Sequence, residues 1–386
     1  MFTHILKLIW KKKKSNFLMM LEIFVSFLIL FAVWSLSIYT YRNYVKPSGL
    51  KAENVWAVYI NFNTQNDTIR GEYRELVRRH LSNIKEVAHF SFSSGNLPFS
   101  FSSSNRDFEY EGKNTLSDYI NVEPSYAPTL GIEMLAGRWF TYEDTIGKID
   151  PIVITRRMAE NLFGNKEEAV GKVVGLEDNQ QKVVGVVDYF RHKSSFQADE
   201  NCVFAPLGNW ESDMLVKVAP DATPEFEAGL ARSMQQLGKD WTVEIQHLDD
   251  MRRTQDKTIW VPILILFIVC GFLVFNVGLG LFGILFQNIN RRKGEIGLRR
   301  ALGASKSQIW TYFVGETLVI AGFGVFLGLF FAVQLPLLDA LNVESAVYGW
   351  AMLLAVLSIL VMAIGCAFYP SRQAAAIYPA TALHEE

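Results

Sequence analysis

An excess of charge of either sign is missing from this sequence. Lys and Arg total 37 against 39 Asp and Glu, and the formal net charge is −2. A nucleic-acid-binding chain would be expected to carry a basic excess, so nucleic acid is not predicted as a partner. Apolar residues make up 50% of the chain and aromatic residues 13%, which excludes a disordered tail.

Cysteine is also scarce. Of the three cysteines, Cys270 and Cys366 fall inside long apolar runs, which leaves Cys202 alone in the polar part of the chain. No disulfide within that part and no cysteine-based metal site are therefore predicted. The six histidines are scattered and form no HExxH motif, so no metal is expected to bind.

A nucleotide-binding loop is missing as well. The stretch GNKEEAVGKV begins at Gly164, but six residues separate its two glycines where a Walker A loop has four, and Val173 stands where Ser or Thr should hold magnesium. Asp118, Tyr119, Ser194 and Ser195 show no spacing of base and nucleophile. No catalytic residue and no cofactor are predicted for this chain.

What the sequence does have is four apolar runs of the length that a bilayer demands of a helix, about 20 residues. The predicted fold is a membrane protein with four transmembrane α-helices and a large α+β extracytoplasmic domain between the first and the second. The expected segments are a cytoplasmic N-terminus (1–16), four spans (17–41, 257–288, 311–336 and 348–369), the extracytoplasmic domain (42–256), a segment between spans two and three (289–310), an outer loop (337–347) and a cytoplasmic tail (370–386).

The distribution of Lys and Arg predicts the orientation. Lys7 and 11–14 precede span one and six basic residues lie in 291–306, whereas the loop 337–347 contains only Asp339 and Glu344 as charged residues. Both termini are therefore expected in the cytoplasm and the large domain outside. A cleaved signal peptide is the alternative, but the first apolar run is longer than an h-region and ends without a small-x-small pattern.

Within the spans, small residues predict close helix packing at Gly278, Gly280, Gly283, Gly324 and Gly328. The first three also spell GxGxxG, but no strand precedes them, so a dinucleotide site is not expected. Asn276 is expected to contact a neighbouring helix. Glu22 and Glu316 lie near the expected cytoplasmic edge, where pairing with bases is favoured over a proton relay.

The domain between spans one and two alternates strand and helix patterns. Strands are expected at Val55–Phe62, Pro151–Thr155, Lys182–Asp188, Asn201–Ala205, Met214–Val218 and Trp241–Gln246, and helices at Thr68–Val87, 156–163 and Pro224–Leu237. The segment LDDMRRTQDKTIW has no glycine or proline before Pro262, so a helix is expected to continue from it into span two.

The segment RRKGEIGLRRALGASKSQI between spans two and three is basic and broken by glycines. Its bases would hold it at the anionic inner membrane face, Gly297 and Gly303 would allow turns, and Ile296, Leu298, Ala301 and Leu302 would offer an apolar face to a partner. An ordinary positive-inside loop is the simpler alternative. The segment resembles the coupling region of ABC-transporter permeases of the MacB type, and the residues that carry the resemblance are Arg292, Glu295, Ile296, Gly297, Leu298, Arg299, Arg300, Ala301, Leu302, Gly303 and Ala304.

Other stretches resemble the same family in the same order: GIEMLAGRWF, PIVITRRMAENLFG, VVGVVDYFRH and YPSRQAAAIYPATAL. The resemblance implies a porter-like core (50–96 and 201–256) with an inserted lobe (97–200). It also implies a location in the bacterial inner membrane, a separate ABC ATPase that binds ATP and Mg²⁺ in place of a fused one, and a dimer with a second permease copy or paralogue.

The resemblance further implies that ATP-driven motion passes through spans one and two to the outer domain, which is mechanotransmission. Export of a drug, peptide or toxin with a periplasmic adaptor and an outer-membrane channel is the expected role. Two alternatives stay open, namely lipoprotein release from the inner membrane and signalling of the FtsX type that activates a cell-wall hydrolase.

Overall fold

The structure is a computed structural model that describes residues 13–165, 168–175, 180–208, 212–238, 240–338 and 343–376. Lys7, Lys11 and Asp339, on which the predicted orientation partly depends, lie outside the described residues, as does the end of the predicted tail. The chain divides into a helical unit (1–42 and 260–386) and an α+β unit (43–259). Each unit is described by itself.

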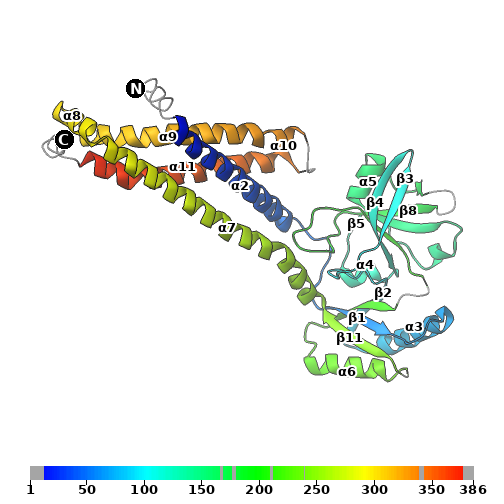
Figure 1. Cartoon of the computed structure of the whole chain (residues 1–386). Coiled ribbons are helices and arrows are strands. Elements are labelled where there is room, and N and C mark those ends of the chain that lie inside the picture. Colours follow the sequence, from blue (N-terminus) through cyan, green and yellow to red (C-terminus); the bar gives the residue numbers. More distant parts are fainter. Residues whose placement is uncertain are drawn as a thin grey trace. The chain divides into compact units, whose positions relative to one another are not determined.

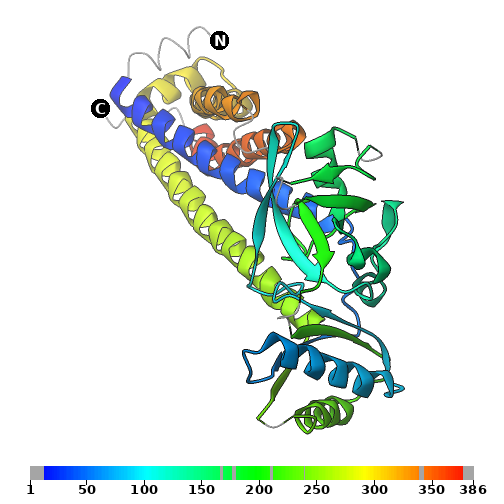
Figure 2. The same cartoon turned by 90° about the vertical axis from the view of Figure 1, so that its right-hand side faces the viewer.

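The helical unit is built from long apolar helices. Four helices in the described residues are long and apolar enough to cross a membrane, in agreement with the four predicted spans. They are α2 (Lys13–Val45), α7 (Leu248–Arg291), α9 (Lys306–Ala332) and α11 (Ser345–Ala375), with the short helices α8 (Lys293–Ala301) and α10 (Gln334–Leu337) between them. Figures 1 and 2 show the four long helices side by side within this unit.

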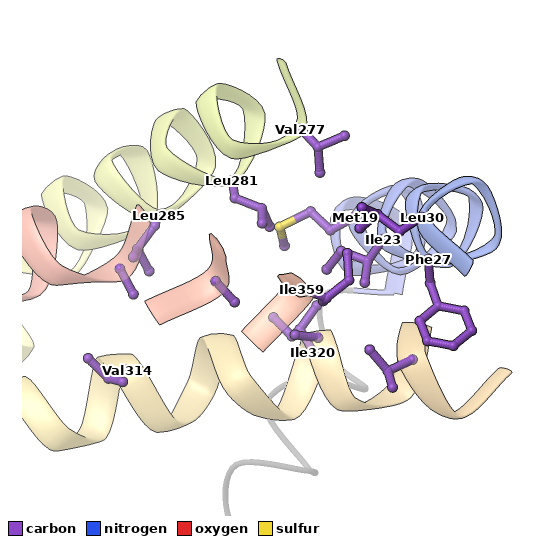
Figure 3. Packing of buried hydrophobic residues seen from close by; sticks show 14 of the residues in the cluster. Met19, Ile23, Phe27, Leu30, Val277, Leu281, Leu285, Val314, Ile320 and Ile359 are labelled. Carbon is purple, nitrogen blue, oxygen red and sulfur yellow. The ribbon is translucent and has the colours of Figure 1, made fainter. Parts of the chain in front are cut away.

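The interior of the helical unit is apolar. Ile23 of α2, Leu281 of α7, Ile320 of α9 and Ile359 of α11 are all at most 6% exposed and belong to one buried cluster. Figure 3 shows these side chains converging from the four helices. Because water is absent from a bilayer core, such contacts join helices by close packing and dispersion, and small residues let the backbones approach.

Four of the five glycines that the sequence analysis singled out lie at close contacts. A Cβ at Gly324 would come within 2.8 Å of Ile23 Cγ2 and 2.9 Å of the Met20 carbonyl oxygen, both on α2, and one at Gly328 would overlap the Phe27 ring. A Cβ at Gly278 would lie 3.0 Å from Cys366 Sγ, and one at Gly280 would lie 3.4 Å from Glu22 Oε1. Gly283 differs, because a Cβ there meets no described atom within 4 Å.

Gly324→Val is therefore expected to destabilise the helical unit. The added methyl groups would press on the Met20 carbonyl, which cannot move without its helix, and overpacking of this kind costs about 1–3 kcal/mol. The measurement is the thermal unfolding midpoint of the purified chain in detergent. Gly322→Val on the same helix is the matched control, because its Cβ would meet no described atom within 4 Å. Equal midpoints for the two variants would contradict the packing of α9 on α2.

In its described residues, the α+β unit contains one sheet of 11 strands, in the order β11-β1-β10-β2-β4-β9-β6-β8-β5, with β3 paired to β4 and β7 paired to β8. The strands are β1 (Val55–Asn61), β2 (Val87–Ser93), β3 (Asn105–Tyr110), β4 (Lys113–Val122), β5 (Met134–Gly137), β6 (Asp150–Thr155), β7 (Val173–Val174), β8 (Gln181–Val187), β9 (Cys202–Pro206), β10 (Asp213–Val218) and β11 (Thr242–His247). The helices are α3 (Asp67–Ser82), α4 (Tyr126–Leu130), α5 (Arg156–Phe163) and α6 (Pro224–Gln235), with the 3-10 turn η1 (Glu143–Ile146).

The two ends of this sheet have separate hydrophobic cores. Helices α3 and α6 cover one face of β1, β2, β10 and β11 (Figure 1), where Val58, Leu81 and Met234 are buried together. Helix α5 covers β4, β6, β8 and β9 through Met158 and Leu162. Between the two parts, β2 and β4 pair through Ser93 and Val122 alone, but a third core that includes Ala57 of β1, Leu215 of β10 and Phe204 of β9 spans both parts.

The predicted boundary of the inserted lobe at residue 201 does not match this sheet. Strand β9 was grouped with the core segments, but it pairs parallel to β4 and antiparallel to β6, and Val203 and Ala205 are buried among the lobe strands. A short, continuous apolar run such as CVFAP marks a strand that is covered on both faces, but it does not identify the neighbouring strands.

The predicted helix Thr68–Val87 is too long. Helix α3 ends at Ser82, and Asn83 then bonds through its side chain to the Arg79 carbonyl, which ends the helix. Ile84 continued the helical spacing of apolar residues and so misled the sequence analysis. The strands β2, β3, β4, β5 and β7 were not predicted. Between β3 and β4, Glu111 and Gly112 both have positive φ, as a two-residue hairpin turn requires.

Helix α7 continues from β11 through the whole second span, as predicted. It begins at Leu248, directly after β11, runs for 44 residues and contains Pro262. The predicted strand and helix at Pro151–Phe163 are also present, and Gly164 ends α5 in the left-handed region at φ 79°.

Candidate functional site

The short helix α8 between α7 and α9 is the best defined candidate site. It covers Lys293–Ala301, so Gly297 lies inside the helix and is buried rather than forming the predicted turn. The turn predicted at Gly303 is present, with a φ of 95°. Ser305 then begins α9 with a capping box, in which its hydroxyl accepts from the Gln308 amide and the Gln308 side chain accepts from the Ser305 amide.

An ion-pair network fixes α8 to the start of α9. Arg292 donates to Glu295 at 2.9 Å and to Glu316 at 3.1 Å, and its Nη2 donates to the Tyr312 hydroxyl at 3.2 Å. Arg299 donates to Glu295 and lies over the Tyr312 ring. The hydrogen bonds from Arg292 are the main reason that the pKa of Glu295 lies below its usual value. The pairing expected for Glu316 is therefore present, and Tyr312 is a member that the sequence analysis missed.

The exposed residues of α8 and its C-cap include large apolar side chains beside the charged Glu295. Leu298 is 53% exposed and Leu302 is 81% exposed, and Ala301 is exposed between them. Ile296 was predicted to belong to the same face, but it is 2% exposed and lies in the core of the helical unit. Large apolar side chains are costly to leave in water, so Leu298 and Leu302 are the residues of this segment that a partner could cover.

The basic residues of the segment have different roles. Arg300 bonds to the Ala304 carbonyl at 2.9 Å, so it braces the turn after α8. Arg292 and Arg299 bind acids and Tyr312, as described above. Of the residues predicted to form an outward surface, Leu298 and Leu302 are exposed, whereas Ile296 is buried.

Buried polar side chains in the described part of the helical unit include Ser26 and Thr317, whose hydroxyls donate to carbonyls of their own helices. Asn276 was expected to contact a neighbouring helix, but its Nδ2 donates at 2.8 Å to the Phe272 carbonyl of its own helix and its side chain is exposed.

In the described residues, no group of three or more His, Cys, Asp or Glu side chains could hold a metal ion. In the stretch GNKEEAVGKV, the backbone amide of Gly171 donates to the Val183 carbonyl at 2.7 Å, so this glycine pairs with β8.

Two family models match the chain. The model described as the MacB-like periplasmic core domain matches residues 17–232. The model described as the FtsX-like permease C-terminal domain matches residues 261–379. Together they cover most of the chain and leave residues 233–260 unmatched, a stretch that includes β11 and the start of α7.

Several curated proteins are similar in sequence. They include the macrolide export ATP-binding/permease protein MacB of Escherichia coli K12, 27% identical over 289 residues, and that of Bordetella avium, 24% identical over 281 residues. MacB of Bdellovibrio bacteriovorus is 23% identical over 333 residues. The alignments cover 70%, 69% and 80% of this chain but 42%, 42% and 48% of these relatives, so the chain spans about half their length.

Two solved structures are similar to part of the chain. The periplasmic region of MacB from Actinobacillus actinomycetemcomitans is 17% identical, with a TM-score of 0.38, and covers 54% of this chain and 94% of that one. The extracellular domain of the ABC-type transporter YknZ from Gram-positive bacteria is 17% identical, with a TM-score of 0.36, and covers 50% of this chain and 100% of that one.

Proposed function

Since this chain belongs to the family of the MacB-like periplasmic core domain, we propose that it is a permease subunit of an ABC transporter in the bacterial inner membrane. In this proposal α8 faces the cytoplasm and binds a separate ATPase, and the α+β unit lies outside the membrane. The observation that carries the proposal is the exposed pair of Leu298 on α8 and Leu302 at its C-cap, on a segment fixed at its base by Arg292, Glu295 and Glu316.

A docking helix must meet two requirements. It must expose apolar side chains that a partner can cover, and it must be attached rigidly enough to transmit force to the spans. Leu298, Ala301 and Leu302 meet the first requirement. The network of Arg292 with Glu316 and Tyr312 meets the second, because it joins the end of α7 to α9 across the turn.

The route of the force to the outside is helix α7. It is continuous from Arg291, next to α8, to Leu248, next to β11. ATP binding and hydrolysis in the partner would move α8, and α7 would carry that movement to the α+β unit. The apolar interior of the helical unit supports this mechanotransmission, since a soluble cargo would need polar groups along the spans.

A second permease copy is the proposed occupant of the uncovered side of α7. Only 6% of the most apolar 18-residue window of α7 is buried, against 28–39% for the other three spans. A groove of about 830 Å³ lies between α7 and α11, and Gly271, Gly278 and Gly365 are among its lining residues. Small residues are the usual sites of close contact between helices in lipid, so a helix of a second copy fits this groove better than loosely held lipid.

The cargo would be handled outside the membrane. Export of a drug, peptide or toxin is the role that we propose, with an adaptor and an outer-membrane channel as further partners. Release of lipoproteins, or signalling to a cell-wall hydrolase, uses the same coupling and differs only in what the α+β unit contacts.

The purified chain alone is expected neither to bind nor to hydrolyse ATP, because its sequence contains no phosphate loop with the Walker A spacing. The measurement is isothermal titration of ATP with Mg²⁺ into the chain in lipid nanodiscs, followed by the same titration after an ABC ATPase of the same cell has been added. Heat of binding should appear only in the second titration. Specific ATP binding by the chain alone would refute the proposal that a separate ATPase binds the nucleotide.

A further inference from the structure

The side chain of Arg191 is buried where helix α2 ends. It is 2% exposed, and its guanidinium donates to the carbonyl oxygens of Asn43, Lys46 and Pro47, the last at 3.1 Å. The final carbonyls of any helix lack partners within the helix and carry its negative end, so a cation with several donors suits this place. All of these residues belong to the α+β unit.

The same guanidinium also holds its own loop. Arg191 Nη1 lies 3.2 Å from the Ser195 carbonyl and 3.1 Å from the Gln197 carbonyl. We call residues 189–200 the clamp loop. Its contacts with the end of α2 include a stack of Phe196 on Tyr44, with ring centroids 5.2 Å apart, and an ion pair of Asp199 with Lys46 at 3.3 Å.

The clamp loop also binds the first turns of α7. The Ser195 amide donates to Asp256 Oδ1 at 2.7 Å, and the Ser195 hydroxyl donates to Asp256 Oδ2 at 2.8 Å. One carboxylate of α7 is thus held by both donors of a single residue. Ser195 therefore touches α7 while its carbonyl is held by Arg191.

The loop itself is fixed to the sheet. Lys193 donates to Asp118 of β4 at 2.8 Å and to Glu200 at 2.6 Å, and the Phe99 amide donates to the His192 carbonyl at 2.5 Å. Burial alone would lower the pKa of Lys193, but these two acids raise it above its usual value. The loop is therefore a rigid part of the α+β unit.

We propose that Arg191 is a positioning residue that locks the ends of α2 and α7 to each other through the clamp loop, so that spans one and two drive the α+β unit as one body. The inference rests on the proposed function in taking these two helices as the moving spans. The geometry of the clamp does not depend on that function, because every one of these contacts lies within the α+β unit.

Arginine is required for this role because of its shape. Its planar fork presents donors in several directions at once, and these reach carbonyls on both the helix end and the loop. Lysine keeps the charge but has a single ammonium group, so Arg191→Lys should keep part of the contacts. Methionine has a similar length and no donors, so Arg191→Met should release the helix end.

The test is a distance measurement by pulsed electron spin resonance on the full chain in nanodiscs. Labels are attached at Val45→Cys on α2 and Arg253→Cys on α7, which are 64% and 74% exposed, after the native cysteines have been replaced by alanine and the labelled chain has been diluted with unlabelled chain. The parent should give one narrow distance peak. Arg191→Met should lose that peak in favour of a broad distribution, and Arg191→Lys should lie between the two.

Arg78→Met is the matched control, because Arg78 is also a largely buried arginine of this unit but pairs with Glu123 away from both helix ends. It should keep the narrow peak. A narrow peak in Arg191→Met overturns the proposal, and so does equal broadening in Arg78→Met. If Arg191→Met does not fold, Asp256→Ala, which removes only the contact with α7, decides by the same measurement. No ATPase is present, so failure of the proposed function would show in the measurements with ATP and the ATPase and would leave this result standing.

Discussion

A chain carrying both Leu298→Asp and Leu302→Asp should insert into the membrane normally but lose its ATPase. Leu298 on α8 and Leu302 at its C-cap are both exposed, so the change costs little within the chain itself. In the proposed complex both would be covered, and a central apolar residue of an interface is worth about 2 kcal/mol or more. We therefore expect the dissociation constant for the ATPase to rise by roughly 30-fold or more.

The measurement is binding of the ATPase to the chain in nanodiscs, by biolayer interferometry. Leu116→Asp is the matched control, because Leu116 is 57% exposed and lies on β4 of the α+β unit. It should bind the ATPase as the parent does. Unchanged affinity in the double variant would mean that α8 is an ordinary connecting loop.

A flexible α7 should uncouple ATP hydrolysis from movement of the α+β unit and thus from transport or release of the product. Lys257→Gly with Thr258→Gly places two glycines on exposed positions of α7, without changing the register of the helix. Each glycine costs about 1 kcal/mol relative to alanine, so the pair raises the population of locally opened helix by roughly 30-fold. We expect the ATPase rate in proteoliposomes to stay near that of the parent, while the transported or released product falls severalfold.

Two variants control for other causes. Lys257→Ala with Thr258→Ala removes the same side chains but keeps a stiff helix, so it should work as well as the parent. Asn276→Leu should also have little effect, because Asn276 binds only the Phe272 carbonyl of its own helix among the described contacts. A harmless glycine pair together with an inactive Asn276→Leu at normal ATPase rate would instead indicate a path for cargo through the spans.

The long elements could be read from the sequence because each follows from a local pattern. Four apolar runs predicted the four long helices, and the unbroken polar helix before Trp260 predicted that α7 starts near Leu248. The strand and helix at Pro151–Phe163 were fixed by a run of β-branched residues, an amphipathic pattern and Gly164. These signals act over about ten residues, which is the range that sequence patterns cover.

What the sequence could not provide is the arrangement of parts that are distant in the chain. The parallel pairing of β4 with β9 joins residues about 84 positions apart, as in Asp118 with Cys202, and no pattern in either strand specifies the other. Ile296 fitted the apolar face of α8 by spacing but is buried in the bundle. Arg191 lay in a recognised stretch, but its role depends on carbonyls 144–148 residues away.

The central claim is that ATP moves the α+β unit. It is tested most directly by the distance between Arg253→Cys labels on two copies, measured by pulsed electron spin resonance in nanodiscs that contain the ATPase. The account predicts one distance with ADP, a different one with a non-hydrolysable ATP analogue, and no difference in the variant with Leu298→Asp and Leu302→Asp. The same distance with both nucleotides in the parent chain, under conditions in which ATP is hydrolysed, would contradict it.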